Sequence, residues 1–130
     1  MGTTALRQAL ADFNDGDAFF HHLAEDVVAE FPYGPTLGLP AEITGKHAVR
    51  AHLAAVQAGG LTVRDPAVEQ LTGTRYLAEY TGTYRTADGT PVDIPLIAVV
   101  DHDGTRIRTI REYWDTHRLA LLNSAVSEGH

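Results

Sequence analysis

The second half of the chain changes its hydrophobic period, and this change constrains the fold more than any other feature. From residue 61 onward apolar and polar residues tend to alternate, which is typical of strands because successive side chains point to opposite faces. The segments with this pattern are residues 61–71, 75–85, 92–101 and 106–114. Glycine-containing turns separate them, namely Thr72-Gly73, Ala87-Asp88-Gly89 and Asp103-Gly104. The pattern predicts antiparallel hairpins, with a bulge or an edge position at Pro66 and at Pro95.

The first half of the chain has a helical period. Thr3 or Thr4 can cap a helix that ends near residue 14, and a shorter helix is expected over residues 18–24. A third helix is expected from Gly45 to about residue 58, where Gly59-Gly60 ends it. The remaining expected elements are a short strand at 27–31, an ordered loop at 33–44 and a final helix at 117–124.

Three helices followed by a four-stranded meander predict one α+β domain that spans residues 1–130. A curved sheet of this kind needs a cover on one face, and the helices can supply it. A pocket between the helices and the concave face is then the natural ligand site. The sequence leaves open whether the loop at 33–44 acts as a lid.

Composition and missing motifs exclude several classes of function. The chain has no cysteine, so thiolate nucleophiles, thiolate metal sites and disulfides are excluded. With 10 basic and 17 acidic residues, it lacks the positive charge that nucleic-acid binding requires. It has no nucleophilic-serine motif, no phosphate-binding loop and no dinucleotide fingerprint. The seven histidines lack metal-ligand spacing, so no metal is expected. We expect a soluble, cytoplasmic protein without a signal peptide or membrane span.

Glu112 is the least expected residue of the last predicted strand. Alternation places its carboxylate on the same face as Ile110 and Trp114. In an apolar pocket its pKa would rise, which suits a carboxyl group to proton transfer. The structural alternative is a solvated carboxylate or one paired with an arginine.

His52 is the second candidate for acid/base chemistry. It lies on the apolar side of the predicted helix, together with Val49, Leu53 and Val56. A histidine titrates near neutral pH, so His52 and Glu112 facing one pocket could exchange protons with a ligand. The structural alternative for His52 is a residue at the core edge that is bonded to a backbone carbonyl.

Aromatic residues are candidates for the pocket wall. Tyr76, Tyr80 and Tyr84 share one face of a strand, with Ala78 and Gly82 between them. Such small residues could leave space for a ligand, but alternation does not decide whether this face is the inner or the outer one, where tyrosines serve dimer interfaces. The side chains of Phe31, Tyr33 and Trp114 are expected to form pocket wall or plain core.

The ordered motifs resemble the SnoaL-like, nuclear transport factor 2-like superfamily, which includes ketosteroid isomerases, polyketide cyclases and phenazine-biosynthesis A/B proteins. The resemblance covers nearly the whole chain. The motifs that carry it are Asn14-Asp15-Gly16-Asp17, Val28-Ala29-Glu30-Phe31-Pro32, Gly45-Lys46, Asp103-Gly104 and Arg111-Glu112-Tyr113-Trp114-Asp115. It implies a cone-shaped, curved antiparallel sheet wrapped by three N-terminal helices, a deep apolar pocket, no cofactor and a homodimer.

The resemblance also assigns roles to single residues. Phe31 stands where ketosteroid isomerases carry their aspartate base, and Ile97 or Leu96 stands where they carry an oxyanion-hole aspartic acid. Glu112 matches the acid/base residue of SnoaL-type cyclases, whose histidine on the preceding strand is replaced by Ile97. The site pattern is most similar to the phenazine proteins, in which a histidine and a glutamate correspond to His52 and Glu112.

We therefore expect a small cofactor-free enzyme, a cyclase, isomerase or dehydratase, that acts on an apolar metabolite in secondary metabolism. Its catalytic residues would be Glu112 and His52. The side chains expected to contact substrate are those of Phe31, Tyr33, Val49, Val56, Tyr80, Tyr84, Ile97, Ile110 and Trp114. Two alternatives are a non-catalytic binding module that uses the same pocket and an interaction module that dimerises through Thr109, Arg111 and Tyr113.

Overall fold

The computed structural model describes residues 2–120. Its helices are α1 (Thr3–Ala11), α2 (Lys46–Ala58) and three 3-10 turns, η1 (Asp12–Asn14), η2 (Gly16–His22) and η3 (Gly34–Leu37). Its strands are β1 (Leu23–Glu30), β2 (Glu42–Thr44), β3 (Thr62–Gln70), β4 (Arg75–Arg85), β5 (Pro91–His102) and β6 (Ile107–Trp114). Residues 116–120 are helical, and the rest of the helix predicted at 117–124 lies outside the described residues.

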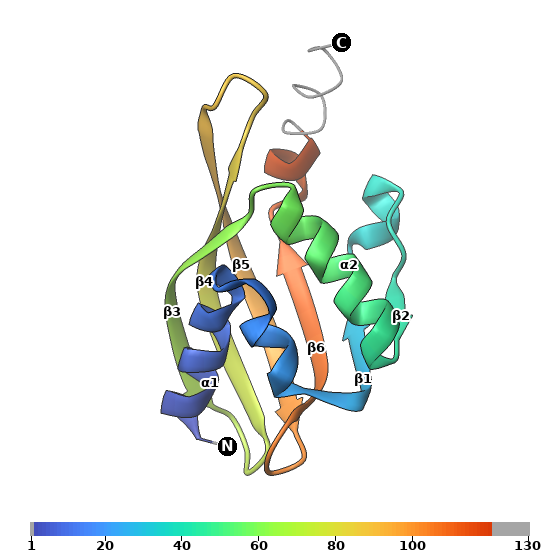
Figure 1. Ribbon diagram of the computed structural model, residues 1–130, viewed down its shortest axis with the longest axis vertical. Coiled ribbons are helices and arrows are strands. Elements are labelled where there is room, and N and C mark those ends of the chain that lie inside the picture. The colour runs from blue at the N-terminus through green and yellow to red at the C-terminus, as the bar shows by residue number, and fades with distance from the viewer. Residues whose placement is uncertain (1, 121–130) are drawn as a thin grey trace.

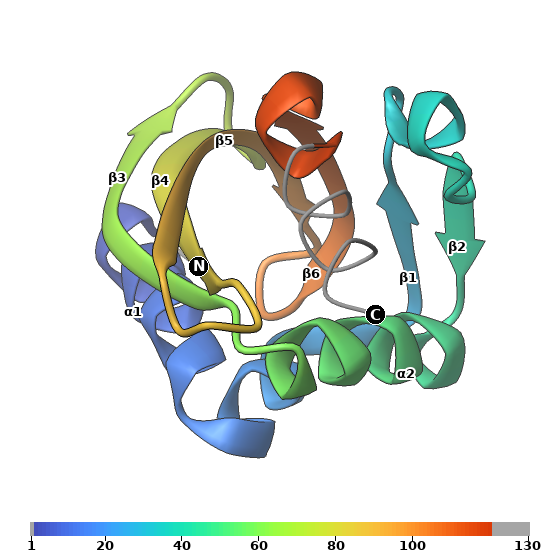
Figure 2. The ribbon, with the colours of Figure 1, turned by 90° about the horizontal axis from the view of Figure 1, so that it is seen from above.

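One curved sheet holds all the strands in the order β2-β1-β6-β5-β4-β3. Figure 1 shows α1 and α2 on the same face of this sheet, and Figure 2 shows how the sheet curls around that side. Helix α1 packs against β3 and α2 packs against β1. The α+β class with a curved sheet wrapped by helices, expected from the period change, is confirmed. No helix within the described residues is long and apolar enough to cross a membrane.

The predicted hairpins are confirmed. β3, β4, β5 and β6 pair antiparallel in sequence order, and β4 has the predicted bounds, 75–85. The register of β3 shifts between Arg64 and Ala67, and Asp65 there has a positive φ of 53°. Pro66 therefore lies in a bulge, as its missing N–H predicts. Pro95 pairs with Thr81 of β4, while the pairing of β5 with β6 begins only at Leu96, so β5 is locally an edge.

Three segments differ from the sequence prediction. The helix expected at 18–24 is a 3-10 turn that ends at residue 22, and the strand expected at 27–31 begins already at Leu23. Leu23 is fully buried and pairs with Ile107 in parallel, so long-range strand pairing overrides the local pattern. The segment expected to be a loop at 33–44 contains η3 and also β2, whose antiparallel pairing covers the free edge of β1.

The Asn14 side chain connects the end of the first helical segment to the edge strand. Its Nδ2 donates to the Val63 carbonyl at 2.6 Å, and its Oδ1 accepts from the Val63 N–H at 2.7 Å. Asn14 thus replaces a neighbouring strand for one residue of β3. Since Val63 lines the cavity described below, this pair also positions part of the cavity wall.

Replacing Asn14 with Ala should lower the free energy of unfolding by about 1–3 kcal/mol, because both polar groups of the Val63 peptide lose their partner. Urea unfolding followed by circular dichroism measures this change. Gln8→Ala is the control, since the exposed hydrogen bond of Gln8 to Asp12 should contribute less than about 0.5 kcal/mol. Equal effects of the two substitutions would contradict the structural role of Asn14.

Candidate active site

A cavity of about 180 Å³ lies between the helices and the inner face of the sheet. Its wall consists mostly of aliphatic and aromatic side chains. The polar groups of the wall belong to His52, Tyr80, Tyr84, Glu112 and Trp114. An apolar cavity with a few convergent polar groups is the usual form of a small-molecule site.

The register of the central strands places Glu112 on the inner face. Glu112 pairs with Ala98 of β5, and Ala98 pairs with Ala78 of β4. In the next row toward the end of β6, Trp114 pairs with Leu96, and Leu96 pairs with Tyr80. The two fully buried alanines are small, so the row that contains Glu112 leaves room beside its side chain.

Both carboxylate oxygens of Glu112 accept a hydrogen bond. The Tyr80 hydroxyl donates to Oε1 at 3.2 Å, and the Trp114 indole N–H donates to Oε2 at 3.0 Å. Burial raises the pKa of Glu112, and the two donors lower it by a smaller amount, so its pKa lies above the ordinary value of 4.5. Glu112 is thus a carboxyl group that is oriented at both oxygens and is more basic than a solvated one.

His52 reaches the same cavity from α2. Its ring lies 5.2 Å from the ring of Phe31, which in turn stacks on Trp114 at 5.3 Å. Burial lowers the pKa of His52 below 6.5, so the imidazole is neutral at neutral pH. Within residues 2–120 its ring nitrogens have no hydrogen-bond partner, unlike those of a core-edge histidine held by a backbone carbonyl. They can therefore bond a ligand.

The structure decides the face of the tyrosines, which is the inner one. Tyr80 and Tyr84 line the cavity, and burial together with the nearby charge of Glu112 raises the pKa of Tyr84 to about 12. Tyr76 is buried farther along the strand, where it stacks on His102. Gly82 does not leave space for a ligand, because a Cβ there would lie 2.8 Å from the side chains of both Leu61 and Leu96.

Three of the residues expected to contact substrate lie away from the cavity. Ile97 pairs with Tyr113 on the outer face and is 42% exposed, so its neighbour Leu96 lines the cavity instead. Tyr33 is 49% exposed and packs edge-on against Tyr113. Val49 is fully buried in the core. The expected placement of Ile97 in the cavity was wrong, since neighbouring residues of a strand point to opposite faces. Tyr33 lies in the loop after β1 and Val49 lies in α2, so strand alternation does not place either of them.

The other residues expected at the site do line the cavity: Phe31, His52, Val56, Tyr80, Tyr84, Ile110, Glu112 and Trp114. The structure brings them together, while their catalytic or substrate-binding roles stay predictions.

Several cavity residues were missed by the sequence analysis. Leu96 and Val100 of β5 lie on the same face as Ala98, which pairs with Glu112 of β6. Alternation could therefore have identified them once the strand pairing was known. Ile107 faces inward because the register shifts near His102, which alternation does not reveal. Leu39 and Leu119 come from the loop and from the helical turn after β6, where the sequence offers no periodic signal.

The described residues do not form a ligand set for a metal ion. No group of three or more His, Asp or Glu side chains among residues 2–120 could hold a metal ion. The chemistry that the cavity offers is proton transfer, with hydrogen-bond donors from Tyr80, Trp114 and neutral His52.

Comparison with known proteins agrees with this architecture. Residues 5–110 match the model of the SnoaL-like domain. The chain belongs to the SnoaL-like domain family. No curated protein matches this SnoaL-like chain.

Solved structures share the fold of this SnoaL-like protein along nearly its whole length. A Bacillus subtilis protein provisionally assigned as an isomerase is 23% identical with a TM-score of 0.80, over 96% of this chain and 97% of that one. A Xanthomonas campestris protein provisionally assigned as a polyketide cyclase is 28% identical with a TM-score of 0.73, over 92% and 95%. A nuclear transport factor 2-like Burkholderia pseudomallei protein of unknown function is 21% identical with a TM-score of 0.72, over 94% and 98%.

Replacing Glu112 with Gln should stabilise the fold at about pH 8, because a buried carboxylate that lacks a cation costs free energy. The folded-state pKa of Glu112 is raised, so wild-type protein loses stability as pH rises from the unfolded pKa, near 4.5, to the folded value. The difference in the free energy of unfolding between Glu112→Gln and wild-type protein should increase across this window by about 1.4 kcal/mol per pH unit and then stay constant.

Thermal or urea unfolding across this pH range measures this difference. Glu69→Gln, which removes an exposed carboxylate of β3, is the control and should show no such pH dependence. A difference that does not change with pH would contradict a raised pKa of Glu112.

Proposed function

We propose that this SnoaL-like protein is a cofactor-free acid/base enzyme, of the cyclase, isomerase or dehydratase type, that acts on a small apolar metabolite in biosynthesis. The observation that carries the proposal is the placement of Glu112. Its carboxylate faces an apolar cavity and is oriented by two donors, and neutral His52, whose ring nitrogens have no hydrogen-bond partner within residues 2–120, lines the same cavity. The provisional assignments of the Xanthomonas and Bacillus proteins as a cyclase and an isomerase support it.

In the proposed mechanism Glu112 moves the key proton. Above its pKa the carboxylate removes a proton from a carbon next to a carbonyl or imine group of the substrate. The N–H of neutral His52 donates to the oxygen or nitrogen on which negative charge develops, which stabilises the transition state. Glu112 then returns the proton to another atom, so an isomerisation or ring closure needs no net proton.

The surrounding residues make this transfer efficient. Tyr80 and Trp114 fix the carboxylate, so no side-chain reorganisation is needed at the moment of reaction. The stacked rings of Phe31 and Trp114 exclude water from one side of the base. Together, orientation and desolvation would explain why a carboxylate rather than a stronger base suffices.

A non-catalytic binding module with the same cavity is the alternative function. The pKa of Glu112, measured by NMR titration, separates the two. An ordinary, solvent-like pKa would favour simple binding over catalysis.

The proposed base can be tested without knowing the natural substrate. 5-Nitrobenzisoxazole is a planar compound that opens to a coloured nitrophenolate when a base removes its ring C–H proton and the N–O bond breaks. Wild-type protein should accelerate this opening above acetate at equal concentration, and Glu112→Gln should lose about 10²–10⁴-fold. The rate should rise with pH through the raised pKa of Glu112 and then level off, because acid protonates the base.

His52→Ala should reduce the same rate by a smaller factor, since it removes only the donor to the developing phenolate. His47→Ala, an exposed histidine of the same helix, and Glu69→Gln are the matched controls and should have no effect. A wild-type rate no higher than that of acetate, or full activity in both Glu112→Gln and His52→Ala, would contradict the proposal.

We also propose that the protein is a homodimer through the outer face of the sheet, where Thr109, Arg111 and Tyr113 lie. Ile97, which pairs with Tyr113, exposes 42% of its surface there, and the buried Nε of Arg111 has no hydrogen-bond partner within residues 2–120. Ile97→Lys should convert the dimer into a monomer in light scattering, because it places a charge in the interface. Leu71→Lys, in an exposed turn, should leave the dimer intact. A monomeric wild-type protein at micromolar concentration would contradict the proposal.

A further inference from the structure

We propose that the cavity selects its substrate by charge: it prefers a small organic cation, a protonated amine or iminium group on a ring or short apolar body, and excludes carboxylates. The inference rests on the proposed function, because it takes Glu112 as the group that meets the substrate. It narrows the proposed apolar metabolite to one whose small apolar body carries a positively charged nitrogen.

The first observation in support is that the described cavity wall has an acidic side chain but no permanently charged basic one. No Lys or Arg is among the described residues that line it. The titratable groups near Glu112 are Tyr80 and Tyr84 from β4 and His52 from α2, and all three are neutral at neutral pH because burial raises the tyrosine pKa values and lowers that of His52. Once Glu112 is ionised, the described wall therefore carries a single negative charge and no positive one.

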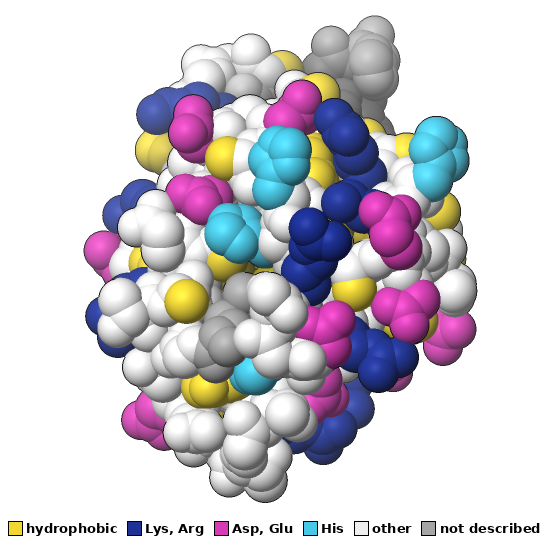
Figure 3. All heavy atoms as spheres, turned by 60° about the horizontal axis from the view of Figure 1, so that its bottom comes forward, with side chains coloured by type: hydrophobic (Ala, Val, Ile, Leu, Met, Phe, Trp, Pro, Cys, Tyr) yellow, Lys and Arg dark blue, Asp and Glu magenta, His cyan; other side chains and the backbone are white. Residues whose placement is uncertain are grey.

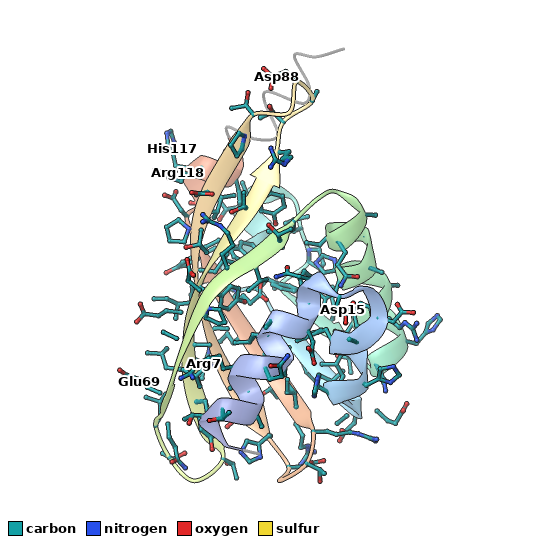
Figure 4. The ribbon with its side chains drawn as sticks, turned by 60° about the vertical axis from the view of Figure 1, so that its left-hand side comes forward. Arg7, Asp15, Glu69, Asp88, His117 and Arg118 are labelled. Atoms are coloured by element: carbon teal, nitrogen blue, oxygen red, sulfur yellow. The ribbon has the colours of Figure 1, made fainter. Side chains whose placement is uncertain are left out.

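The second support is that the protein's own cations are directed elsewhere. The guanidinium of Arg111, the neighbour of Glu112 in sequence, lies over the Tyr113 ring at 5.9 Å. Arg118 donates to the Asp93 carbonyl at 2.9 Å, and Figure 4 shows it on the helical turn that follows β6. Arg50 and Arg108 form ion pairs with surface carboxylates. Figure 3 shows basic side chains interspersed with acidic ones on one face of the molecule.

The third observation in support is that the Glu112 carboxylate can accept more hydrogen bonds than the described residues donate to it. Within residues 2–120, Glu112 accepts one bond at each oxygen, both from neutral donors, although a carboxylate offers about four acceptor sites. A buried carboxylate without a counter-ion is costly, and a ligand N⁺–H would supply both the missing charge and a charge-assisted hydrogen bond. An anionic ligand would instead bring a second negative charge beside the first.

The lining also fits a cation of limited size. The aromatic rings of Phe31, Tyr80 and Trp114 are grouped around the carboxylate, and aromatic faces attract organic cations. The volume of about 180 Å³ is slightly larger than the roughly 150 Å³ of a cavity known to hold benzene. A nitrogen cation next to the reacting carbon would also acidify its C–H bond, which suits a carboxylate base.

Three probes of nearly equal size and different charge test the proposal: benzylamine, benzyl alcohol and benzoate. Titration calorimetry at about pH 8 should show benzylamine binding about tenfold more tightly than benzyl alcohol, with benzoate weakest. At a pH just below the pKa of Glu112, benzylamine binding should also release the proton of Glu112 to the buffer, because the bound cation favours the carboxylate. The measured heat of binding should then depend on the ionisation enthalpy of the buffer.

Glu112→Gln should remove the preference for benzylamine while it retains benzyl alcohol, which also shows that the variant is folded. Glu69→Gln makes the same change in net charge on the exposed edge strand, where Figure 4 shows its side chain pointing away from the helices, and should keep the preference. Benzylamine binding no tighter than benzyl alcohol, a preference that survives in Glu112→Gln, or benzoate binding as tightly would overturn the inference.

These outcomes are distinct from those of the proposed function. If Glu112→Gln loses benzisoxazole opening but wild-type protein shows no preference for benzylamine, the acid/base function is supported and the charge selection is overturned. If wild-type protein prefers benzylamine but opens benzisoxazole no faster than acetate does, the cation-selective cavity is supported and the proposed acid/base function is overturned.

Discussion

The pairing of β5 with its two neighbours determines the rest of the structure. Because β5 is held by β4 on one side and by β6 on the other, one register sets which residues of three strands face the helices. It aligns Tyr80, Leu96 and Trp114 in one inward row and Ala78, Ala98 and Glu112 in the next. A slip by one residue on β6 would turn Glu112 and Trp114 toward the outer face and leave the cavity without its acid.

Glu112 combines two opposing physical effects. Burial disfavours its charge, and the hydrogen bonds from Tyr80 and Trp114 favour it, with burial the larger of the two. A carboxylate with more donors or a nearby arginine would be stable but weakly basic, while one without donors would stay protonated. The observed arrangement lies between these limits, which is the physical basis of the role proposed for Glu112.

The sequence predicted the fold well because the fold depends on local patterns. The bounds of β4, the hairpin turns and the bulge at Pro66 follow from alternation, glycine turns and the missing proline N–H. Helix α2 follows from its apolar stripe. By contrast, β1 and β2 depend on pairing between distant segments, so the sequence placed β1 too late in the chain and missed β2. The sequence analysis also missed Leu39 and Leu119 of the cavity wall, because the loop and the helical turn that hold them have no periodic pattern.

The sequence by itself determined that Glu112 shares a strand face with Trp114 and that His52 lies on the apolar side of its helix. Alternation and helical spacing fix such relations within one element. Only the tertiary structure decided which face of the sheet the tyrosines occupy, that Leu96 rather than Ile97 is internal, and that Phe31 packs between His52 and Trp114. Period 2 specifies that neighbours differ in face, but which face is internal depends on where the helices pack and how the sheet curves.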